Sequence, residues 1–170
     1  MGLFDKLTGT RRPAGGVAPC SAEEVHAALL ALNGPEVPYV VRDGAAEGVD
    51  LVAEWRMTEP AWHTFFARTQ LSRAVQIRMR LVSEDHEVRV AEEQREVTWV
   101  GGSPRFAMSR EYGRGPTKTV SRHWTIGRRS DGHVERTETF RYDSSELKEP
   151  LQGAVLTAGW TWRGVLFGKV

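Results

Sequence analysis

The run VQIRMRL at residues 75–81 alternates an apolar side chain with a polar one at every step. Successive side chains of a β-strand point to opposite faces of its sheet, so this period of two predicts a strand with one buried and one wet side. Gln76, Arg78 and Arg80 are then expected to face solvent. Short connections to the neighbouring runs favour an antiparallel meander over parallel crossovers.

Two more runs extend the same sheet. Residues 49–57 alternate in the same way and place Glu54 on a solvent-facing side. In residues 87–100 the parity of the valines changes between Val90 and Val97. A change of parity within one strand predicts a bulge or turn, here near residues 91–95.

A last hairpin is predicted to join residues 119–126 to residues 134–142. Its apolar face carries charged residues among aromatic ones, and four of them form the candidate ligand-binding site: Arg122, Trp124, Arg136 and Glu138. One register would place Arg122 opposite Glu138 and Trp124 opposite Arg136. The other would place Trp124 opposite Glu138 and Arg122 opposite Phe140.

Charges on a buried face need partners or a ligand, so two interpretations of this hairpin remain open. In the first, an Arg122–Glu138 ion pair and a contact between Arg136 and Trp124 close a self-satisfied network. In the second, the hairpin lines a cup between the sheet and a C-terminal helix, where one arginine binds an anionic or amphipathic molecule.

Helices are predicted on either side of the strands. Ser21 and Glu24 have the spacing of a capping box before an amphipathic stripe, and a short helix is expected near residues 59–68. An apolar helix is expected after Asp143 and should pack on the sheet, although the chain beyond Gly159 could instead be a strand. The fold class is therefore α+β, with one curved antiparallel sheet of about six to eight strands.

The chain is expected to form one domain with a flexible leader. Its 170 residues suit a single core. Residues 1–20 are rich in Gly and Pro and predict a flexible tether, so that residues 21–170 form the α+β domain.

Composition argues against several classes of function. A net charge of +1 gives no large field for nucleic acid. Of the 23 basic residues 19 are Arg, a bias typical of a bacterial-type, GC-rich genome. Cys20 is alone, the five histidines are dispersed, and no phosphate-binding loop or nucleophile motif occurs. The sequence therefore favours a non-enzymatic protein without metal or cofactor.

The first residues carry no apolar run of signal-peptide length, so a cytoplasmic location and no transmembrane segment are expected. Leu3, Phe4 and Leu7 could form one apolar turn that makes at most weak peripheral contact with a membrane, or could simply fray.

The order of elements over residues 21–168 is similar in outline to START-like lipid-binding cups. A sheet around an apolar C-terminal helix also looks like the tubby and scramblase-like arrangement. Neither similarity rests on a motif, and both imply ligand or phospholipid contact by analogy only. The expected function is a binding or interaction module. The alternatives are a structural subunit of a larger assembly, or an enzyme acting on a hydrophobic small molecule in the same cup.

Overall fold

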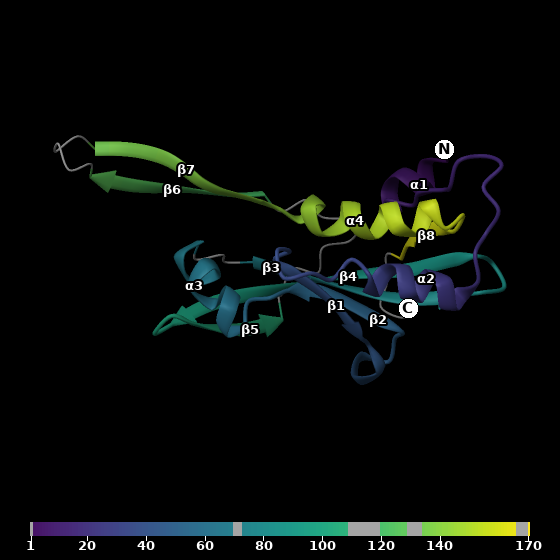
Figure 1. Cartoon of the computed structure of the whole chain (residues 1–170), viewed down its shortest axis with the longest axis horizontal. Helices are drawn as coiled ribbons and strands as arrows, with labels where there is room; N and C mark the ends of the chain where they lie inside the picture. The colour runs from purple at the N-terminus through teal and green to yellow at the C-terminus, as the bar shows by residue number, and fades with distance from the viewer. Residues whose placement is uncertain (1, 70–72, 109–119, 129–133, 166–169) are drawn as a thin grey trace.

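The computed structural model describes residues 2–69, 73–108, 120–128, 134–165 and 170, and for residues 120–128 and 134–144 it describes the backbone alone. Figure 1 shows the helices and strands in chain order. They are α1 (Leu3–Thr8), α2 (Ala22–Leu30), β1 (Tyr39–Asp43), the 3₁₀ turn η1 (Ala45–Glu47), β2 (Leu51–Trp55), α3 (Pro60–Thr69), β3 (Arg73–Val82), β4 (Glu87–Val100), β5 (Ser103–Met108), β6 (Val120–Arg128), β7 (Val134–Asp143), α4 (Ser144–Thr157) and β8 (Thr161–Gly164).

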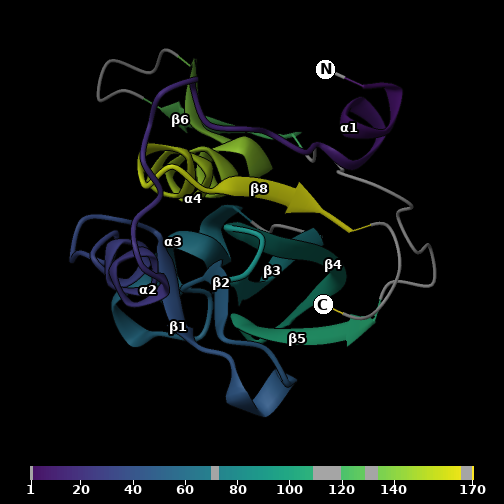
Figure 2. The same ribbon diagram turned by 90° about the vertical axis from the view of Figure 1, so that its right-hand side faces the viewer.

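The main sheet has six strands. β1 to β5 pair antiparallel in chain order, and β8 pairs with β4 in parallel. β8 runs beside residues 87–90 of β4, whereas β5 runs beside residues 95–100, so the two share one edge of this long strand. Viewed along the molecule, β1 to β5 curl round, and α2 and α4 lie outside the curl (Figure 2). The predicted α+β fold with a curved antiparallel sheet is confirmed.

One face of this sheet carries the apolar core of the domain. The pairing of β2 with β3 sets Leu51 opposite Met79 and Ala53 opposite Ile77, and all four side chains are fully buried. The helices α2 and α4 cover this face with further buried residues: Val25 and Leu29 from α2, and Leu147, Leu151 and Val155 from α4. The alternating strands, the apolar stripe of α2 and the apolar helix after Asp143 therefore meet as the sequence predicts.

The N-terminus of α2 is capped as expected. The Ser21 hydroxyl accepts a hydrogen bond from the Glu24 amide at 3.2 Å, and the Glu24 carboxylate accepts one from the Ser21 amide at 2.8 Å. These two bonds satisfy amides that have no partner inside the helix.

The predicted bulge in residues 91–95 is wrong. β4 pairs with β3 in one constant register from Glu87 to Glu96. The valines change parity because both faces of β4 are covered at different places. Val88 and Val90 lie under the helices, whereas Val97 is buried on the opposite face, where it pairs with Phe106 of β5. When a strand is covered first on one face and then on the other, its apolar residues change parity, and the sequence pattern resembles that of a register change.

β6 and β7 form a hairpin that is a separate two-stranded sheet. Figure 1 shows it running away from the main sheet, beyond the start of α4. Its register shifts between His123 and Trp124. The two strands lie close to their predicted bounds, but they do not extend the main sheet.

The C-terminal segment turns from helix to strand. α4 ends at Thr157, and Gly159 adopts a left-handed φ of 76° before β8 begins. A side chain at Gly159 would also press on the backbone of Ala18, since an added Cβ would lie 2.7 Å from the Ala18 oxygen. Glycine therefore suits this turn on both counts, and the strand alternative beyond Gly159 is the one observed.

Residues 8–20 pack along the C-terminal segment. Arg11 and Trp162 exchange two backbone hydrogen bonds of 2.8 Å, and the Cys20 amide donates to the Ala158 oxygen at 2.9 Å. Thr8 lies so close to Gly164 that a Cβ there would overlap the Thr8 carbonyl oxygen. The structure thus places this segment on the domain, while the predicted domain boundary at residue 20 stays a prediction.

Candidate functional site

The second face of the sheet carries charges and is not solvent-facing in the way predicted. Gln76 is only 2 % exposed, although alternation predicts it to point to solvent. Its strand neighbours Arg78, Glu54 and Arg95 are half-buried. The expectation of a wet face is therefore wrong for the middle of this sheet, because the curl of the sheet turns these side chains towards one another.

Arg42 of β1 anchors one end of the polar network. Its Nε donates to Glu54 at 2.9 Å, and its Nη2 donates to Glu47 at 2.5 Å. Nη1 donates to a second Glu47 oxygen at 3.1 Å and to the Asp43 carbonyl at 3.0 Å. A planar guanidinium can bind two carboxylates at once in this way, which an ammonium group could not reproduce.

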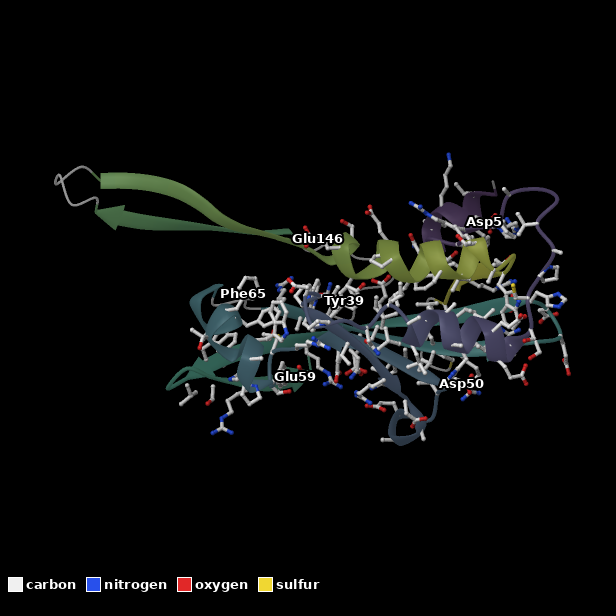
Figure 3. All side chains as sticks on the ribbon, viewed as in Figure 1. Asp5, Tyr39, Asp50, Glu59, Phe65 and Glu146 are labelled. Carbon is white, nitrogen blue, oxygen red and sulfur yellow. The ribbon has the colours of Figure 1, made fainter. Side chains whose placement is uncertain are left out.

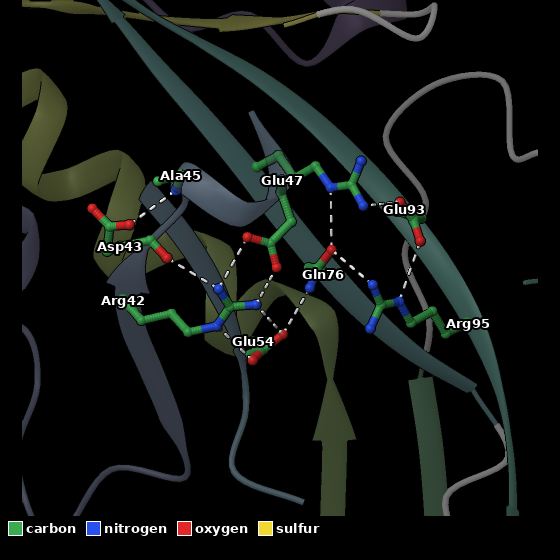
Figure 4. Close-up of polar contacts among 9 residues, drawn as sticks. Arg42, Asp43, Ala45, Glu47, Glu54, Gln76, Glu93 and Arg95 are labelled. Atoms are coloured by element: carbon green, nitrogen blue, oxygen red, sulfur yellow. Dashed lines mark hydrogen bonds and ion pairs between the residues drawn. The ribbon is translucent and has the colours of Figure 1, made fainter. Parts of the chain in front are cut away.

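Gln76 connects that cluster to β4 (Figure 4). Its amide nitrogen donates to Glu54 at 2.8 Å, and its carbonyl oxygen accepts from Arg78 at 3.2 Å and from Arg95 at 3.1 Å. Both arginines also bind Glu93, at 2.7 Å for Arg78 and 3.2 Å for Arg95. We call the whole set the concave-face network; its members are Arg42, Glu47, Glu54, Gln76, Arg78, Glu93 and Arg95.

The network balances three arginines with three glutamates. Hydrogen bonds to Glu47 and Glu54 raise the pKa of Arg42, and the hydrogen bond from Arg42 lowers the pKa of Glu47. Both shifts favour the charged forms. The formal charges of the three arginines and the three glutamates cancel, so the network is neutral as a unit.

A hollow of about 270 Å³ opens at this network. All five antiparallel strands contribute to its walls, which shows that this face of the curled sheet is the concave one. Its lining combines charged or polar residues with apolar ones: Arg42, Glu47, Glu54, Thr58, Gln76 and Arg95 with Trp55, Met57, Ala74, Val75 and Phe106.

Arg95 is a lining residue with unused hydrogen-bonding capacity among the described residues. Its Nε and Nη2 bind Glu93 and Gln76, and its Nη1 donates to no partner among the described residues (Figure 4). Phe106, on the neighbouring β5, lines the same hollow and is 41 % exposed. A cationic donor and an exposed aromatic ring thus share one small cavity.

The interface between the sheet and the C-terminal helix α4, where the cup was predicted, is filled by side chains in its described part. Leu147, Leu151 and Val155 of α4 are fully buried against the sheet. An ion pair crosses this interface, from Lys148 Nζ to Glu92 Oε1 at 2.8 Å. The described part of this interface is therefore packed, and the hollow lies on the opposite face of the sheet.

The four predicted site residues lie on the separate hairpin. Backbone pairing sets Trp124 opposite Glu138, as one of the two predicted registers required, and sets Arg136 opposite Ile126. The register shift places Arg122 opposite Arg141, which neither register predicted. Their side chains lie outside the described part of the chain, so both the closed network and the cup remain predictions for this hairpin.

Sequence reasoning missed the concave-face network. A signal did exist, because polar positions on neighbouring strands carry opposite charges that a meander brings together, as when the pairing of β3 with β4 brings Arg78 to 2.7 Å from Glu93. Alternation shows which residues share a face, but it does not show whether that face is flat and wet or curved and enclosed. Charge complementarity between strands was the missing criterion.

In the described residues, no group of three or more His, Cys, Asp and Glu side chains could hold a metal ion. No helix in that same part of the chain has the length and apolar character to cross a bilayer. No protein-family model, curated protein or solved structure matches the chain.

Proposed function

We propose that this protein is a non-enzymatic binding module whose hollow takes a small amphipathic molecule with one carboxylate or similar planar anion. The observation that carries the proposal is Arg95 Nη1, which donates to no partner in the described part of the chain and shares one cavity with the exposed ring of Phe106. An arginine suits a planar anion, and Trp55 and Met57 add apolar wall for the rest of the ligand. The proposal includes a cytoplasmic location.

The size and charge of the hollow limit the ligand. Small-molecule sites usually measure about 300 to 1,000 Å³, so a hollow just below that range suits a compact molecule. The concave-face network is neutral without a ligand, so one added anion can be accommodated at Arg95, whereas a second would compete with Glu93 for the same cation.

The pKa shifts favour binding over acid–base catalysis. A general acid or base needs a pKa near the working pH, whereas Arg42 and Glu47 are shifted away from neutrality in the direction of their charged forms. The alternatives of an enzyme and of an assembly subunit predict, respectively, turnover of a bound molecule and a stable complex with another chain.

The test combines native mass spectrometry of the gently purified full chain with calorimetric titration of compact aliphatic and aromatic monocarboxylates. We expect carboxylates to bind and the amines of the same skeleton not to bind. Arg95→Gln should weaken binding about tenfold or more, because a charge-assisted hydrogen bond is lost.

Arg80→Gln is the matched control. Arg80 lies on β3, is exposed, and binds the Gly48 carbonyl outside the hollow, so its loss should leave the affinity unchanged. The proposal is wrong if no carboxylate binds and the native mass is that of the chain alone. Equal losses in both arginine variants would also contradict it.

A further inference from the structure

The helix α1 presents an unpartnered apolar face. Leu3 is 77 % exposed and Phe4 74 %, which makes them the most exposed large apolar side chains in the described part of the chain, and Leu7 is 55 % exposed. Residues three and four apart lie on one side of a helix, so Leu7 lies beside both of the others. We call Leu3, Phe4 and Leu7 the α1 face.

The domain holds this helix in place. Thr10, two residues after α1, is buried, and Arg11 bridges to Trp162 in β8. In both ribbon views α1 lies beyond β8 and α4, on the side away from β1 to β5 (Figures 1 and 2), and Asp5 marks it there in Figure 3. A frayed terminus would have no fixed direction, whereas this helix presents its apolar face at an outer end of the molecule.

Basic residues lie in α1 and in the chain that directly follows it. Lys6, Arg11 and Arg12 are exposed. The one acidic residue of the helix, Asp5, accepts hydrogen bonds from Arg12. Two of the three basic side chains, Lys6 and Arg11, therefore keep their charge uncompensated by this carboxylate.

We propose that the α1 face docks on an anionic lipid surface. Membrane binding by a short apolar turn is weak alone and is strengthened by basic residues near the headgroups, each worth about fivefold in affinity. A second copy of the chain fits less well, because a stable protein interface takes roughly 20 residues a side and this face offers three side chains. Two copies would also bring their basic residues together.

The test is co-sedimentation of the full chain with two kinds of vesicle, phosphatidylcholine alone and phosphatidylcholine with phosphatidylglycerol. We expect binding to the anionic vesicles, weakened by added salt, and little binding to the neutral ones. Phe4→Ser should weaken binding about tenfold or more, and Arg11→Gln about fivefold.

Val100→Ser serves as the matched control. Val100 is 56 % exposed at the end of β4, so the variant loses an exposed apolar side chain away from α1 and should bind like the wild type. Circular dichroism checks that each variant is folded, and these surface changes should leave it so.

Three results would overturn the proposal. They are equal sedimentation with and without anionic vesicles, equal binding by Phe4→Ser and Val100→Ser, and light scattering that shows a dimer disrupted by Phe4→Ser in a chain that does not bind vesicles. None of these results depends on a ligand in the hollow, so this inference can fail while the proposed binding module stands.

Discussion

The two faces of the curled sheet both bury side chains, but they do so by different chemistry. The helix-covered face buries apolar side chains such as Leu51 and Ile77 completely. The concave face buries Gln76 to a similar degree but surrounds it with ions that satisfy one another. Burial alone therefore does not identify a core. On one face it reflects removal of apolar surface from water, and on the other it reflects a closed set of hydrogen bonds.

This difference has an energetic consequence. Apolar burial stabilises in proportion to area and does not depend on the charge state of neighbours. A network of ion pairs contributes little net stability but becomes costly when one member is lost, because the remaining polar groups stay partly buried. The helix-covered face should consequently set the stability of the fold, and the concave face should set its sensitivity to pH and its ligand chemistry.

The largest expected effect is on the helix-covered face. Leu151→Ala removes a fully buried side chain of α4 and should lower the free energy of unfolding by about 2 to 5 kcal/mol, measured by urea denaturation. Leu7→Ala changes the same residue type at an exposed position and should shift stability by less than about 0.5 kcal/mol. Similar losses in the two variants would show that α4 is not packed on the sheet.

A smaller loss is expected at the centre of the concave face. Gln76→Met keeps the size of the side chain but removes the amide that serves Glu54, Arg78 and Arg95, so the free energy of unfolding should fall by about 1 to 3 kcal/mol. Arg80→Met, on the exposed part of the same strand, should cost less than about 0.5 kcal/mol. An unchanged free energy of unfolding in Gln76→Met would mean that the network does not constrain the sheet.

The smallest expected effect is the pH-dependent loss of stability on replacing Glu47. Arg42 lowers the pKa of Glu47 below its ordinary value of 4.5, so the stability from this pair is present above pH 4.5 and is lost as the pH falls through the lower, folded-state pKa. The deficit of Glu47→Gln should be below about 1 kcal/mol at neutral pH, since Arg42 is partly exposed, and should shrink in acid.

Leu151→Ala is the comparison for that titration. It changes no ionisable group, so its deficit in urea denaturation should stay constant over the same pH range. A Glu47→Gln deficit that is as large in acid as at neutral pH would contradict the assigned ion pair.

The sequence predicted the parts of this fold that depend on local chemistry. The capping box at Ser21, the alternation in residues 75–81 and the short helix near residues 59–68 all correspond to observed elements. The elements of the main sheet follow because strand periodicity and helix capping are set by neighbours along the chain.

The candidate site could not be predicted in the same way. Whether Gln76 is buried depends on how strongly the sheet curls, and the curl depends on residues distant in sequence, from Arg42 to Phe106. The false bulge in β4 has the same origin, because coverage of each face changes along the strand. The separate position of the β6–β7 hairpin is likewise a matter of tertiary arrangement, which the alternation of its residues does not encode.

Thiol accessibility shows whether the second face of the sheet is enclosed. In a chain with Cys20 replaced by Ser, no other native cysteine remains, so Gln76→Cys and Arg80→Cys each carry one thiol on the same side of β3. The labelling rate of the folded protein should be about a hundredfold lower or more for Gln76→Cys than for Arg80→Cys, with equal rates in denaturant. Equal, rapid labelling of both folded variants would show instead that this face is flat and open to solvent.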